Sequence, residues 1–199
     1  MPRQAGYTVH DIAAAILAKT GPISAMKFQK LVFYAQATHL AAHHTPLFED
    51  RIEAWAQGPV VRSLYNQHRG SYSVADWPNG DPTQLSEQAQ RSVDETVARY
   101  GHLSAANLSA LSHRELPWRA ARGNLAPNLR SDNPIPISLI ESFYSHHGGM
   151  TEHALRNVVA NAVLEGVEPS EAAQKLAAQV LAGRNADEAV AAFLEHATG

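Results

Sequence analysis

The sequence predicts a mainly α-helical protein with a small β element, followed by a three-helix appendage. Apolar residues recur at helical spacing through most of the first 147 residues. A short stretch from Leu47, LFEDRIEAW, alternates instead as a strand does. The composition changes at Gly148-Gly149. Beyond this point alanine is frequent and Phe193 is the single aromatic residue. The chain has 199 residues, of which 45% are hydrophobic, and this is enough apolar material for a core.

The expected helices are marked by capping residues and by breaks. Thr8 can cap a helix that ends at Gly21-Pro22, and the S-x-x-E pattern at Ser138 predicts a capping box for a helix to about His146. Residues with capping side chains open the predicted helices of the first part of the chain at Thr8, Ser24, Ser86, Ser104 and Ser138. Three further helices are expected at about 151–165, 170–182 and 186–196.

The β element and the loops follow from turn residues. The alternating stretch from Leu47, interrupted by Gly58-Pro59, predicts a short strand pair or an extended segment. A polar loop is expected over 69–85, with Trp77 attaching it to the core. The run LPWRAARGN from Leu116 is interpreted as a tight segment that leads into irregular structure.

Charge and composition limit the classes of partner. The net charge of the chain is −3. The residues from Asn157 onward include six acidic residues and two basic ones, Lys175 and Arg184, so their net charge is −4, and the first 156 residues carry +1. Nucleic acid is therefore not an expected partner. The acidic end indicates either a basic protein surface as partner or simply a solvated face. No cysteine is present, so disulfides are excluded, and this composition is typical of the cytoplasm. No apolar run near 18 residues predicts a membrane span.

Chemical motifs are scarce. Eleven histidines are present, but the adjacent pairs His43-His44 and His146-His147 do not have the spacing of metal ligands. The G-x-S-x-G, P-loop and G-x-G-x-x-G patterns are missing. The sequence therefore nominates no catalytic residue, no metal site and no cofactor, and it does not predict an enzyme.

One resemblance covers residues 7–147. The QKLVFYAQ run from Gln29, the Phe48–Trp55 segment and the run LSALSHRELPWRAAR from Leu108 resemble the Panacea domain of promiscuous antitoxins and proteolytic adaptors. The resemblance implies a helical domain with a small β element that works by binding proteins, without catalysis. Its candidate residues either build the fold, which is the favoured interpretation for the aromatic residues and the Gly-Pro pair, or contact a partner. They are Lys30, Trp55, Gly58, Pro59, Tyr65 and Trp118.

A second resemblance covers about residues 154–196. NAVLEG, from Asn161 to Gly166, resembles the Fic-inhibitory motif, in which Ser or Thr is followed after three residues by Glu and then Gly or Asn. The following VEPSEAAQKLAAQVLAGRNADEAVAAFL resembles a VbhA-type antitoxin domain. The resemblance implies that Glu165 competes with the ATP γ-phosphate for an arginine of a Fic enzyme, while Gly166 permits close approach. Asn161 departs from the motif's hydroxyl residue. The alternative is an ordinary helix ending, with Gly166 as the residue after the last turn.

These resemblances together predict two domains, 1–147 and 148–199, and a cytoplasmic antitoxin that inhibits a Fic-family adenylyltransferase toxin. The alternative is a Panacea-type adaptor that works with an ATP-dependent protease, or an antitoxin that neutralises a toxin of another class. A weaker alternative is a DNA-binding autoregulator.

Overall fold

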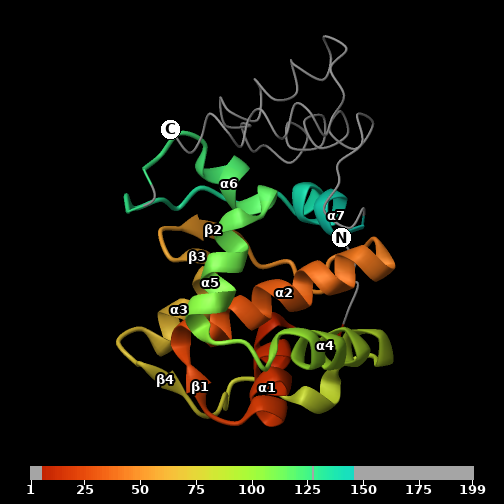
Figure 1. Ribbon diagram of the computed structural model, residues 1–199. Coiled ribbons are helices and arrows are strands. Elements are labelled where there is room, and N and C mark those ends of the chain that lie inside the picture. Colours follow the sequence, from red (N-terminus) through yellow and green to blue (C-terminus); the bar gives the residue numbers. More distant parts are fainter. Residues whose placement is uncertain (1–5, 127, 146–199) are drawn as a thin grey trace.

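The computed structural model of the protein describes residues 6–126 and 128–145, and these residues are mainly helical with two short β ladders (Figure 1), as the sequence predicts. The predicted appendage, with Asn161, Glu165 and Gly166, lies outside the described residues. The elements in chain order are α1 (Val9–Thr20), β1 (Ile23–Ser24), α2 (Ala25–His43), β2 (Ile52–Trp55), β3 (Gly58–Val61), α3 (Arg62–His68), β4 (Ser73–Val74), the 3₁₀ helix η1 (Pro82–Gln84), α4 (Glu87–Tyr100), α5 (Ala105–Arg114), α6 (Leu116–Arg122) and α7 (Ile137–Ser145).

The N-terminal ends of α1, α2, α4 and α5 confirm the predicted capping residues. Before α1, the backbone N–H of Thr8 donates to Oδ2 of Asp11 at 2.6 Å, and its hydroxyl donates to the same oxygen at 2.9 Å. Serine caps α2, α4 and α5, and in each case its Oγ accepts the backbone N–H three residues later. These N–H groups have no partner within their own helix, so each cap stabilises the first turn by about 1 kcal/mol. The caps are Ser24, Ser86 and Ser104.

The start of α7 differs from the prediction. A helix is present, but it begins at Ile137, so Ser138 lies inside the first turn and does not cap it. The carbonyl oxygen of Pro136 accepts the first backbone hydrogen bonds, at 3.1 Å from Leu139 and 3.2 Å from Ile140. The capping-box prediction for Ser138 is therefore wrong. Its Oγ is buried and has no hydrogen-bond partner within the part of the chain that the structure describes.

Helix α2 is the centre of the fold and packs against α1, α4, α5, α7 and β3 (Figure 1). Most of its residues are buried, including polar side chains that bond to the backbone of neighbouring segments. Gln36 Oε1 accepts from the N–H groups of Leu47 and Phe48 at 2.8 and 3.1 Å. Gln29 Oε1 accepts from the N–H group of Val61 at 2.9 Å. Because buried amides need partners, these contacts fix both segments against α2.

The predicted strand pair is present as the antiparallel hairpin β2–β3, with Ala56 and Gln57 forming its turn. Its limits differ from the prediction, because the first strand begins at Ile52 and not at Leu47, whose N–H group is bound by Gln36. Gly58 and Pro59 lie inside β3 and do not terminate the strand pair. A proline is tolerated there because each strand of a two-stranded ladder has an edge that needs no donor.

Two segments contain more regular structure than the sequence predicts. The predicted loop over 69–85 includes β4, which pairs with β1, and η1. Its Trp77 is buried as predicted, and its Nε1 donates to Nδ1 of His10 at 3.1 Å. The tight segment from Leu116 is the helix α6, which carries a proline in its first turn, where no helical N–H is needed. None of the helices over 6–126 and 128–145 is long and apolar enough to cross a bilayer.

Candidate partner-binding site

The six residues singled out by the Panacea resemblance meet around the β2–β3 hairpin. Lys30 of α2 donates from Nζ to the carbonyl oxygen of Pro59 at 3.0 Å. Trp118 of α6 donates from Nε1 to the carbonyl oxygen of Trp55 at 2.9 Å. The rings of Trp55 and Tyr65 meet edge to face, with centroids 4.6 Å apart. Three helices therefore hold one hairpin through residues that are far apart in the sequence.

Lys30 supports the hairpin from beneath. Its side chain is only 1% exposed, and burial lowers its pKa to about 7 because the charged form loses hydration. It lies against Gly58, whose φ is +101°, and a Cβ on that glycine would come within 2.6 Å of Lys30 Cε. Lys30, Gly58 and Pro59 are all buried, so a docking protein does not reach them. They build the fold.

Trp118 is also a structural residue. It is 7% exposed, its ring stacks on His113 at 4.1 Å, and the guanidinium of Arg122 lies 5.0 Å from the ring centroid. Arg122 is itself buried and donates to the carbonyl oxygen of Ala54 at 3.1 Å and to that of Leu129 at 2.9 Å. These contacts attach α6 and the chain that follows it to β2.

Glu53 is a residue that the sequence reasoning missed. Glu53 is a charged residue but is only 3% exposed, and residues near Pro134 run antiparallel beside it along β2. Its carboxylate accepts from Trp55 Nε1 at 2.7 Å and pairs with Arg62, whose terminal nitrogen lies 2.7 Å away. Since no local pattern shows which distant segment will cover a strand, the sequence held no signal for this burial.

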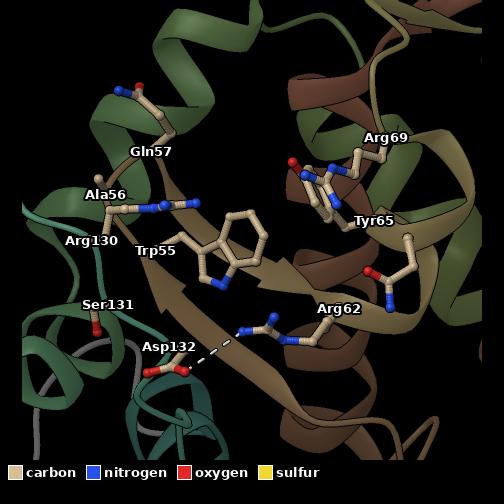
Figure 2. Close-up of a pocket in the computed structure, with 10 residues that line it drawn as sticks. Trp55, Ala56, Gln57, Arg62, Tyr65, Arg69, Arg130, Ser131 and Asp132 are labelled. Carbon is tan, nitrogen blue, oxygen red and sulfur yellow. Dashed lines mark ion pairs between the residues drawn. The ribbon is translucent and has the colours of Figure 1, made fainter.

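Beside the hairpin lies an open pocket of about 530 Å³. Trp55 and Tyr65, both half-buried, form its aromatic surface, and three arginines, an aspartate and small or uncharged polar side chains line the rest (Figure 2). The pocket joins the β2–β3 turn, α3 and the segment 130–132. Its charged lining residues are Arg62, Arg69, Arg130 and Asp132.

Of the six candidate residues, the structure therefore places Trp55 and Tyr65 where a partner can reach them. The pocket arginines were not predicted. Arg62 and Tyr65 are spaced i and i+3, which places them on one face of α3, and this spacing was a usable signal; Arg69 follows directly after the helix. Arg130 had none, because it reaches the pocket from a segment far along the chain.

A second cluster lies away from the pocket, around Glu115. Its Oε2 accepts from the hydroxyls of Tyr34 at 3.0 Å and Tyr144 at 2.7 Å, which connects α2 and α7 to the link between α5 and α6. Burial raises the pKa of Glu115 to about 7, although both hydroxyls favour its charged form. Across residues 6–126 and 128–145, no three His, Cys, Asp or Glu side chains are grouped so that they could hold a metal ion.

Residues 28–119 match the family described as Antitoxin SocA-like, Panacea domain. No curated protein and no solved structure matches the chain. The matched span runs from α2 into α6 and contains all six residues that meet at the hairpin. It supports the Panacea resemblance for this span, and the family's description suggests an antitoxin role with a toxin as partner. The match does not include residues 148–199.

Proposed function

We propose that the protein is an antitoxin that binds and inhibits a Fic-family adenylyltransferase toxin. The observation that supports this is the occurrence, in one chain, of a match to SocA-like antitoxins over residues 28–119 and of the NAVLEG motif from Asn161. In this proposal residues 1–147 form a partner-binding domain and residues 148–199 form the inhibitory domain.

The proposed inhibition is a competition for one arginine of the toxin. A Fic enzyme transfers AMP from ATP, and an arginine in its active site holds the γ-phosphate during transfer. Glu165 would pair with that arginine, because a carboxylate and a guanidinium form the same two parallel hydrogen bonds that a phosphate forms. Gly166 would let the helix end approach closely, and the Asn161 amide would replace the hydroxyl of the motif.

The test is the variant Glu165→Gly in complex with a Fic-family adenylyltransferase that the wild-type protein binds. We expect the complex to form, because the apolar side chains of residues 148–199 should provide most of the interface, and we expect AMP transfer from labelled ATP to be released. Glu168→Gly is the matched control, since it removes an acidic residue three positions further on and should leave transfer blocked. Transfer that stays blocked with Glu165→Gly would rule out the competition.

A second candidate function is supported by the pocket at the hairpin, part of which lies within the matched span. A pocket open to a partner suits a Panacea-type adaptor that delivers a protein to an ATP-dependent protease, or an antitoxin that neutralises a toxin of another class. The lifetime of the partner distinguishes the cases. An adaptor shortens this lifetime, whereas an inhibitor leaves the partner intact and bound.

A further inference from the structure

We propose that the pocket formed by the β2–β3 turn, α3 and residues 130–132 binds a short acidic segment of a protein partner, one that carries a carboxylate next to an aromatic or aliphatic side chain. The inference rests on the proposed function only in that the partner is a protein. It needs neither a Fic toxin nor Glu165.

The pocket offers a fixed apolar surface. Trp55 packs edge to face on Tyr65 at 4.6 Å, and its Nε1 is held by Glu53 at 2.7 Å, so the orientation of the indole is set before any ligand arrives. Both rings remain half-buried. Aromatic side chains on a rigid support provide a large contact area at little entropic cost, which is why they are frequent at the centres of interfaces.

The charge of the pocket is unbalanced. Arg62 is neutralised by Glu53 at 2.7 Å and faces Asp132 at 3.8 Å. Arg69 and Arg130 are exposed, and neither has an ion-pair partner among residues 6–126 and 128–145. Figure 2 shows Arg130 extending over Trp55 from one side and Arg69 lying beside Tyr65 on the other. Two free guanidinium groups beside an aromatic surface complement a carboxylate that has an apolar neighbour.

Charge in the rest of the structure argues for a peptide over a nucleic acid. Residues 6–126 and 128–145 contain as many acidic as basic side chains, so this part of the chain carries no net positive charge. Binding to a phosphate backbone needs several cations along an extended track. A volume of about 530 Å³ instead matches a site that receives a few side chains.

The supporting residues make the site rigid. The hairpin is held at Pro59 by Lys30 and at the carbonyl oxygen of Trp55 by Trp118, and both donors are buried. A surface whose side chains are locked by such contacts loses little conformational freedom when a ligand binds. Lys30 and Trp118 thus position the hairpin and its Trp55 without touching the ligand.

The experiment is a selection of random heptapeptides displayed on phage, carried out on the full-length protein. We expect the enriched peptides to carry Asp or Glu next to an aromatic or aliphatic residue. Arg69→Ala/Arg130→Ala should weaken their binding at least tenfold, measured by fluorescence anisotropy. Arg69→Lys/Arg130→Lys should have an intermediate effect, because lysine keeps the charge but lacks the fork. A melting curve establishes that each variant is folded.

Lys19→Ala/Arg91→Ala is the matched control, because it removes two positive charges from α1 and α4, which do not line the pocket. It should bind the peptides as the wild type does. An absence of enrichment, enriched peptides without acids, or equal binding to Arg69→Ala/Arg130→Ala would overturn the proposal. Displacement of the peptides by random single-stranded DNA would assign the pocket to nucleic acid. Glu165→Gly should leave peptide binding unchanged, so a failure of the Fic mechanism remains distinguishable.

Discussion

Lys30 lies directly against Gly58, and its Nζ donates to the carbonyl oxygen of the next residue, Pro59, at 3.0 Å. A Cβ on Gly58 would lie 2.6 Å from Lys30 Cε and 2.8 Å from Ser112 Oγ, closer than real Cβ contacts allow. The backbone at Gly58 also has φ +101°, which favours glycine. Backbone conformation and space therefore both require glycine where α2 and α5 meet the hairpin.

Gly58→Ala should destabilise the protein by about 3 kcal/mol, because strained φ and overpacking each cost roughly 1–3 kcal/mol. Gly70→Ala is the matched control, since Gly70 has φ +86° but no heavy atom within 4 Å of an added Cβ. It should cost only the backbone part, about 1 kcal/mol. Urea denaturation measures both free energies of unfolding. Equal losses in the two variants would mean that the contact with Lys30 gives way without cost.

Lys30 should make the stability depend on pH. Burial lowers its pKa from 10.5 to about 7, so the unfolded chain binds more protons than the folded protein between these values. The free energy of unfolding should therefore rise as pH increases from 7 towards 10, and Lys30→Met should flatten this rise. Urea denaturation at pH 7, 8 and 9 measures it. Lys19→Met is the control, because it removes a charge from the surface of α1 and should leave the pH dependence of the free energy of unfolding as in the wild type. The same pH dependence in Lys30→Met would show that Lys30 is not its source.

Local signals predicted local features well. Thr8 and Ser24 mark helix starts correctly because a cap needs only the N–H groups of the next turn. Ser138 fails because the helix already begins at Ile137, with the carbonyl oxygen of Pro136 accepting its first backbone hydrogen bonds. The helical class and the hairpin could thus be read from the sequence, but the limits of the strands could not, since Gln36 of α2 binds the N–H group of Leu47.

The candidate site was predicted only in part. The Panacea resemblance named residues that do meet in space, but most of them are buried and support the hairpin. The accessible pocket needs Arg130, which joins it through the segment that runs along β2. Contacts of this kind depend on how distant segments pack, and neither periodicity nor capping residues encode that.

Glu53 should contribute more to stability than an ion pair on the surface. Its side chain is 4% exposed and accepts from Trp55 and Arg62, so Glu53→Ala leaves the indole N–H without its acceptor. We expect a loss of about 2 kcal/mol, below the usual cost of breaking a buried pair because Arg62 can turn to solvent. Glu87→Ala removes the exposed partner of Arg91 and should cost less than about 0.5 kcal/mol. Thermal and urea unfolding compare the two, and similar losses would contradict a structural role for Glu53.

Glu115 should act in the opposite direction to Lys30. Its pKa is raised from 4.5 to about 7, so the folded protein holds a proton that the unfolded chain has released. The stabilisation that the protonated Glu115 side chain gives the folded protein is fully present below about pH 4.5 and is lost as pH rises to 7. Glu115→Gln keeps an oxygen for the hydroxyls of Tyr34 and Tyr144 but cannot ionise. Its free energy of unfolding should equal that of the wild type near pH 4.5 and should be higher by about 2 kcal/mol at pH 8.

The difference in free energy of unfolding between Glu115→Gln and the wild type isolates this titration. His39, whose pKa burial lowers to about 4, contributes to both proteins and cancels. Glu87→Gln serves as the control on α4, where the carboxylate is exposed, and its difference from the wild type should stay flat between pH 4.5 and 8. A Glu115→Gln difference that is equally flat would show that Glu115 ionises freely in the folded protein. A difference that grows through this range places the neutral carboxyl between α2 and α7.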